Sequence, residues 1–159
     1  MNHGCNGGLV NDAYIYAELH PLETEANYPY HPSSGLFECK YDKTKGLVKV
    51  TKRNTVGGSS VPDFYSALQH GPVSVAVEAD QPVFHQYTGG IVTNVLACGR
   101  NLDHAVLVVG YGEEAGQGYW IVKNSWTTKW GEDGYIRIGV HNGNGVCGIQ
   151  MDPTQADTN

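Results

Sequence analysis

Charged residues are scarce in this sequence, and long apolar runs are absent. Only 16% of the 159 residues are charged, with 10 Lys and Arg against 16 Asp and Glu, for a formal net charge of −6. This balance offers no basic surface for nucleic acid or for an anionic membrane. No apolar stretch approaches the ~18 residues of a membrane span, and the first residues lack the basic and apolar regions of a signal peptide. We therefore expect neither nucleic acid nor a membrane as partner.

Cysteine is also sparse, and its spacing argues against metal binding. The four cysteines show neither a C-x-x-C pair nor a Cys/His cluster of the zinc type. The histidines at 3, 20, 31, 70, 85 and 141 show no i, i+4 pairing. The sequence therefore predicts no metal site and no cofactor, and it favours disulfides for the four cysteines, Cys5, Cys39, Cys98 and Cys147.

Glycine and tyrosine are abundant, at 21 and 10 residues, which is typical of a compact and turn-rich fold. From Leu9, apolar residues recur every three or four positions, which predicts a helix of about three turns ended by His20-Pro21. Residues 21–60 read mostly as loop, with turn residues at 31–35 and a short strand at 47–51. Ser60 to Asp63 has the form of a capping box, so a second helix should bury Phe64 and Leu68 and end at Gly71-Pro72.

The second half has the pattern of an antiparallel sheet. Val73, Val75 and Val77 alternate with Ser74, Ala76 and Glu78, and glycines separate further apolar runs at 105–109, 119–122 and 135–140. The sequence therefore predicts a helical, loop-rich first part and a β-rich second part that meet near residues 50–60.

His104 and Asn124 form the candidate catalytic pair. His104 stands at the start of one predicted strand and Asn124 at the end of the next. Two antiparallel strands joined by a loop at 112–118 would bring these ends together. Asn124 could then hold one imidazole nitrogen while the other faces a nucleophile. An arbitrary histidine and asparagine would instead be a satisfied sheet residue and a turn residue.

Eight short motifs, in order along the chain, remove that ambiguity. They are Gly4-Cys5-Asn6-Gly7-Gly8, Tyr28-Pro29-Tyr30, Gly71-Pro72-Val73-Ser74-Val75, Asp103-His104-Ala105-Val106, Gly110-Tyr111-Gly112, Lys123-Asn124-Ser125-Trp126, Trp130-Gly131 with Gly134-Tyr135, and Cys147-Gly148-Ile149. From Gly4 to about Asp152, the sequence thus resembles the papain family of cysteine peptidases, and its cathepsin L-like branch in particular. The resemblance implies an α+β, papain-like two-lobe fold, with an incomplete helical left lobe at 1–55 and an antiparallel, β-barrel-like right lobe at 56–159.

The resemblance implies thiol-dependent endopeptidase activity, with His104 as acid and base and Asn124 as its orienter. Family members carry the nucleophile in a C-G-S-C-W motif, which would lie roughly 30 to 45 residues upstream of Met1. We therefore expect the chain to lack the nucleophile and to need an N-terminal segment as partner. Cys5 precedes the first helix, where a thiol pKa would be lowered, but 99 residues to His104 are too few.

The other expected partners are a protein or peptide substrate and propeptide- or cystatin-type inhibitors, in a lysosomal or secreted setting. An alternative is a non-catalytic homologue or fragment that binds peptides or inhibitors without cleaving them. The family's closing Tyr-Pro residues are missing from 153–159, which leaves the docking of the C-terminus open.

The resemblance also implies a substrate cleft. Gly7 and Gly8 would form a backbone wall for an extended peptide, with Asp103 beside the catalytic histidine. Asp152 would form the floor of the pocket for the second residue before the scissile bond, and Trp126 would shield the His104–Asn124 hydrogen bond. Apolar side chains would line that pocket: Leu9, Val10, Ala76, Leu102 and Ala105.

By the same resemblance, Cys98 pairs with Cys147, while Cys5 and Cys39 each lose their partner. Thr127 stands where the family usually has glycine, so the backbone there depends on whether a threonine adopts positive φ.

Overall fold

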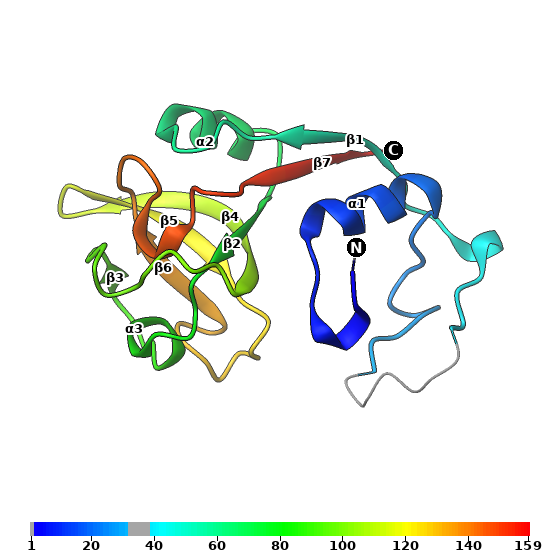
Figure 1. Cartoon of the computed structure of the whole chain (residues 1–159), viewed down its shortest axis with the longest axis horizontal. Helices are drawn as coiled ribbons and strands as arrows, with labels where there is room; N and C mark the ends of the chain where they lie inside the picture. The colour runs from blue at the N-terminus through cyan, green and yellow to red at the C-terminus, as the bar shows by residue number, and fades with distance from the viewer. Residues whose placement is uncertain (1, 32–38) are drawn as a thin grey trace. The chain divides into compact units, whose positions relative to one another are not determined.

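The computed structural model describes residues 2–31 and 39–159, and of Cys5 the backbone alone. Most of the turn sequence expected at 31–35 lies outside the described residues. The chain divides into two compact units (Figure 1). The first unit is Met1–Asn54 with Ala156–Asn159, and the second is Thr55–Gln155.

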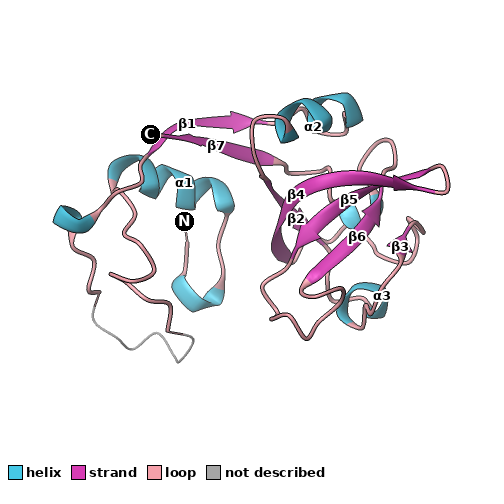
Figure 2. Ribbon diagram, turned by 180° about the vertical axis from the view of Figure 1, so that it is seen from behind, coloured by secondary structure: helices cyan, strands magenta, loops and turns pink. Residues whose placement is uncertain are grey.

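The first unit is built around one α-helix (Figure 2). Helix α1 (Val10–Leu19) ends where His20 takes an extended conformation before Pro21, as the sequence predicts. Two short 3₁₀ turns, η1 (Gly4–Asn6) and η2 (Lys43–Lys45), and strand β1 (Val50–Thr55) complete the regular structure in its described part. The strand expected at 47–51 is wrong in its bounds, because Val48 makes only an isolated bridge with Leu22. Pairing with β7, and not the local apolar residues, sets the position of β1.

The first unit has little buried core of its own. Among its described side chains, Ala17 and Val50 are the buried apolar ones. Arg53 of β1 donates to Glu18 of α1 at 2.6 Å. Nine large apolar side chains are between 39% and 79% exposed: Leu9, Ile15, Tyr16, Leu19, Leu22, Tyr28, Tyr30, Leu47 and Val48. The folded unit thus presents much apolar surface to solvent.

The second unit is a sheet with strand order β7-β2-β4-β5-β6-β3. Its strands are β2 (Val73–Val77), β3 (Ile91–Val92), β4 (His104–Glu114), β5 (Gln117–Lys123), β6 (Tyr135–Gly139) and β7 (Thr154–Thr158), the last of which continues into the first unit. The predicted strands are confirmed, but β3 runs parallel to β6, so the sheet is mixed. The loop expected at 112–118 is shorter, because β4 and β5 pair as far as Glu114 and Gln117.

Helix α2 (Val61–Leu68) begins with the capping residue that the sequence predicts. The Ser60 hydroxyl accepts from the Asp63 N–H at 3.3 Å, and Phe64 is fully buried. The helix ends at Leu68, before Gly71-Pro72, and Gln155 of β7 satisfies carbonyls at this end. Its amide nitrogen donates to the carbonyls of Ala67 at 3.0 Å and Gly71 at 2.8 Å. The C-terminal tail, whose docking the sequence left open, therefore forms strand β7.

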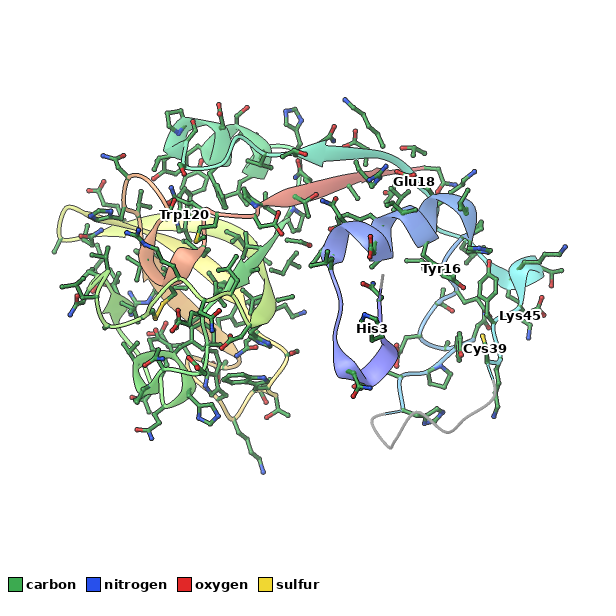
Figure 3. All side chains as sticks on the ribbon, viewed as in Figure 1. His3, Tyr16, Glu18, Cys39, Lys45 and Trp120 are labelled. Atoms are coloured by element: carbon green, nitrogen blue, oxygen red, sulfur yellow. A yellow bond between two sulfur atoms is a disulfide. The ribbon has the colours of Figure 1, made fainter. Side chains whose placement is uncertain are left out.

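The core of the second unit lies between the sheet and its helices. Trp120 of β5, which is labelled in Figure 3, is fully buried. Its ring centroid lies 5.0 Å from that of Phe64 and 4.9 Å from that of Tyr65. The short helix α3 (Pro82–His85) buries Phe84, and the 3₁₀ turn η3 (Val146–Gly148) carries Cys147. The predicted Cys98–Cys147 disulfide is present. No helix in the described ranges is long and apolar enough to span a membrane.

Candidate active site

The sheet brings His104 and Asn124 together. His104 is the first residue of β4, and Asn124 follows directly on the last residue of β5. These strands pair in antiparallel register through Leu107 and Lys123, so the start of one lies beside the end of the other. His104 Nε2 lies 2.8 Å from Asn124 Oδ1. The contact predicted from the two strand ends is therefore present.

A backbone group fixes which way the Asn124 amide points. Its Oδ1 accepts from the Ser125 N–H at 2.7 Å, so the oxygen is held on this side of the side chain. A rotated amide would place its NH₂ group against that N–H. His104 Nε2 is consequently the protonated donor to Oδ1, and Nδ1 is the nitrogen available to a reacting group. The local backbone thus selects the imidazole tautomer.

Aromatic rings surround this hydrogen bond. The Trp126 indole stacks on the His104 ring, with centroids 4.9 Å apart and 28° between the planes. Phe84 meets His104 edge-on at 6.3 Å and Trp126 edge-on at 5.7 Å. Asn124 is buried. Apolar rings therefore restrict water around the pair, which strengthens a hydrogen bond relative to one in solvent.

Three further side chains pack against the Trp126 indole, and the sequence alone had assigned none of them to the site. Phe84, His85 and Trp130 pack around Trp126, with the His85 and Trp126 centroids 5.3 Å apart. Trp130 Nε1 donates to the His85 carbonyl at 3.1 Å. The Trp130-Gly131 motif is a sequence signal for Trp130. Phe84 and His85 lie on α3, which is only four residues long and carries no periodic pattern, so no sequence pattern indicated them.

The segment after Asn124 is held in an unusual conformation. Thr127 has φ of 67°, so the threonine does adopt the left-handed region in which glycine is favoured. The Thr127 carbonyl accepts a hydrogen bond from the Trp130 N–H at 3.4 Å, and the Asn124 N–H donates to the Gly134 carbonyl at 3.0 Å. These bonds return the segment to the start of β6.

A carboxylate–guanidinium pair ties this segment to the loop after α3. Arg137 donates to Glu132 through Nε at 2.9 Å and through a terminal nitrogen at 2.8 Å. These bonds are the main reason that the pKa of Glu132 is lowered to about 2, and the Gly90 N–H adds to the effect. Tyr87 donates to the Gly90 carbonyl at 2.6 Å, and burial raises its pKa.

The predicted substrate residues lie in both units. In the first, Gly7 has φ of 88°, and the Gly8 backbone lies so close to Asn2 that a Cβ there would collide with it. The Leu9 N–H donates to Asn2 Oδ1 at 2.7 Å, and Leu9 is exposed while Val10 is half-buried.

In the second unit, Ala76 and Ala105 are paired across β2 and β4 beside His104. The Leu102 side chain lies against the backbone of Gly148, and Asp103 accepts from the Ala79 N–H at 2.8 Å. Asp152 is exposed. Ala76, Ala105 and Asp103 thus lie next to His104 along β2 and β4, and the assignment of a substrate pocket stays a prediction.

The remaining cysteines and acidic groups supply no metal centre among the described residues, where no group of three or more His, Cys, Asp or Glu could hold an ion. Cys39 is free and exposed, and the Tyr28 hydroxyl donates to its Sγ at 4.0 Å. The Cys5 side chain, predicted to be unpaired, lies outside the described part.

Known proteins match this chain along nearly its whole length. The model of the papain family of cysteine proteases matches residues 1–156. A cathepsin L-like proteinase of Fasciola hepatica is 46% identical over 151 residues, which cover 93% of this chain and 44% of that protein. The cysteine proteinase COT44 of Brassica napus is 43% identical, with coverage of 95% and 46%. The chain spans about half the length of these curated relatives.

Solved structures agree with the sequence matches. The bromelain protease of Ananas comosus, in complex with the E64 inhibitor, aligns with a TM-score of 0.88 at 34% identity over 98% of this chain and 72% of its own. The ragweed pollen allergen Amb a 11, a cysteine protease in its proform, aligns with a TM-score of 0.90 at 34% identity, covering 99% of this chain and 49% of its own. The α+β fold is papain-like, and the chain belongs to the papain family of cysteine proteases.

Proposed function

We propose that this chain carries the acid–base half of a cysteine-type endopeptidase that hydrolyses peptide bonds. The observation that supports this most directly is the hydrogen bond between His104 Nε2 and Asn124 Oδ1, with the amide oriented by the Ser125 N–H. An imidazole held in one tautomer, with Nδ1 free for a thiol, is the arrangement that nucleophilic catalysis by cysteine requires.

The reaction would use His104 twice. As imidazolium, paired with a thiolate, it protonates the leaving amine after the sulfur has attacked the carbonyl carbon. As neutral imidazole, it then removes a proton from water, which attacks the thioester and releases the acid product. Asn124 keeps the ring in place through both steps without adding a charge that would favour one protonation state.

The thiol would come from a segment N-terminal to residue 1. Both cysteines in the unit that holds His104, Cys98 and Cys147, are joined in a disulfide and cannot attack a substrate. The exposed apolar side chains of α1, among them Ile15 and Leu19, are the kind of surface that such a segment would cover. A chain without it would bind peptides or inhibitors but would not cleave them.

The residues that the resemblance assigns to substrate recognition would each contribute as follows. Gly7 and Gly8 offer backbone groups to an extended peptide, and the apolar side chains of Leu9, Val10, Ala76, Leu102 and Ala105 would accept Leu, Val or Phe. Asp152 would add a partner for Arg, although its exposure equally suits a carboxylate that faces only solvent. The ratio of kcat/KM for Arg over Leu substrates, compared between the enzyme and Asp152→Ala, tests its role: an unchanged ratio removes it from the pocket.

The disulfide supports a lysosomal or secreted setting, because such bonds persist in oxidising compartments. E-64, which is bound to the bromelain structure, and propeptide- or cystatin-type inhibitors are the partners to try first.

The decisive experiment compares residues 1–159 alone with a longer form that includes the upstream segment. We expect the longer form to hydrolyse a fluorogenic peptide and to be labelled by E-64. His104→Ala should lower kcat at least ~100-fold. His70→Ala, an exposed histidine that follows α2, is the matched control. Hydrolysis by residues 1–159 alone, abolished by Cys5→Ala, would overturn the assignment of the thiol. Binding without hydrolysis in the longer form would favour the non-catalytic alternative.

A further inference from the structure

Glu78 is a buried carboxylate that the reaction does not use. The alternation of β2 predicts it on the face opposite to the valines, among polar residues, but it is only 7% exposed. One of its oxygens accepts a hydrogen bond from the Asn101 N–H, and the other accepts from the Gln81 amide at 3.1 Å. A buried carboxylate is costly unless such donors satisfy it, and here each oxygen has one.

The chain around Glu78 is shaped to receive the carboxylate. A Cβ at Gly99 would collide with its oxygens, so this glycine leaves room for the carboxylate in its present position. The Glu78 N–H donates to the Cys147 carbonyl at 2.9 Å. The disulfide from Cys147 to Cys98 then fixes the chain just before Gly99. Glu78 therefore ties the segment that leads into β4 to the end of β2.

A second carboxylate makes the reverse connection. Asp103, just before β4, accepts from the N–H of Ala79, just after β2, at 2.8 Å. Each strand end thus supplies a carboxylate to a backbone N–H of the other. The pair Val77 and His104 lies between these two bonds in the register of the sheet. The backbone of His104 is consequently held from both sides.

We propose that Glu78 is a positioning residue for His104: its carboxylate fixes the segment 99–101, and with it the start of β4, so that the imidazole stays aligned with Asn124 Oδ1. This role rests on the proposed use of His104 as acid and base. The proposal predicts that loss of the carboxylate weakens the His104–Asn124 hydrogen bond. The effect would be indirect, because the carboxylate bonds Asn101 and Gln81.

The test measures that hydrogen bond directly by NMR, as the exchange rate of the His104 Hε2 proton with water and the tautomer ratio from the ring nitrogen shifts. Residues 1–159 are used, so no activity is needed. Glu78→Ala should speed the exchange about tenfold, the factor that corresponds to one lost hydrogen bond. Glu78→Gln, which keeps an oxygen for the Asn101 N–H, should restore most of the protection.

Asp80→Asn is the matched control, because Asp80 also accepts from Gln81 but is exposed. It should leave the exchange rate unchanged. If Glu78→Ala does not fold, Glu78→Asp withdraws the carboxylate by one methylene and should still accelerate exchange. A folded Glu78→Ala or Glu78→Asp protein with the wild-type rate and tautomer ratio overturns the proposal. An absence of peptidase activity in the longer form counts against the proposed function alone.

Discussion

The indole of Trp126 lies almost parallel to the imidazole of His104, with centroids 4.9 Å apart. This contact covers one face of the ring that holds the hydrogen bond to Asn124. Trp126→Ala should therefore admit water and lower kcat/KM of the longer form about fivefold, since an aromatic pair contributes about 1 kcal/mol beyond simple burial. Trp126→Phe keeps a ring and should recover much of the loss. Equal effects of the two substitutions would argue against the stacking contact.

Glu132 should make the second unit sensitive to acid. Its pKa in the folded protein is lowered from 4.5 to about 2, mainly by hydrogen bonds from Arg137. Because the folded value lies below the unfolded one, this pair contributes stability above pH 4.5 and loses it as the pH falls towards 2. Glu132→Gln should lower Tm by several degrees at pH 6, with a difference that shrinks towards pH 2.

Glu114→Gln provides the matched control for Glu132. Glu114 also bonds Arg137, at 2.7 Å, but its side chain is 64% exposed against 34% for Glu132. Solvent screening should reduce its contribution, so this variant should change Tm less. A Tm difference for Glu132→Gln that stays constant from pH 6 to pH 2 would show that the effect is not electrostatic.

Sequence patterns predicted the elements whose signal is local. Alternation in Val73 to Val77 and the capping residue Ser60 correctly predict β2 and α2. They fail for β7, which is formed by polar residues, because its position depends on the carbonyls that Gln155 meets in a distant segment. The burial of Glu78 is likewise not visible in the pattern, because Glu78 follows the last residue of β2 and its carboxylate is bound by the distant Asn101 N–H.

In the candidate site, too, only the features with a local signal could be predicted. Strand order alone indicates that His104 and Asn124 meet, while the resemblance supplied Trp126. The Ser125 N–H that orients the amide, and the packing of Phe84, arise only from the folded backbone.

The Cys98–Cys147 bridge should be a main source of stability in the second unit. It spans 49 residues, and both cysteines are about 1% exposed. In the chain-entropy model a loop of this length contributes about 4 kcal/mol. The double variant with alanine at both positions should lower the free energy of unfolding by about that amount, measured in denaturant. Cys39→Ala is the control, because that thiol is free and exposed. Non-reducing peptide maps that join Cys98 to Cys5 or Cys39 would contradict the pairing.

Thr127 offers a substitution that should stabilise the protein. A β-branched residue at φ of 67° is strained, at a cost of about 1 kcal/mol or more. Thr127→Gly removes the strain, although the greater freedom of unfolded glycine offsets part of the gain. Thr127→Asn should gain more, because asparagine tolerates this region and its carbonyl can replace the Thr127 hydroxyl, which accepts from the Lys129 N–H at 3.3 Å. Thr128→Gly, at a neighbouring exposed position without positive φ, should lower Tm. If Thr127→Asn and Thr128→Gly lower Tm equally, the threonine is not strained, and its contacts must compensate for the left-handed backbone beside Trp126.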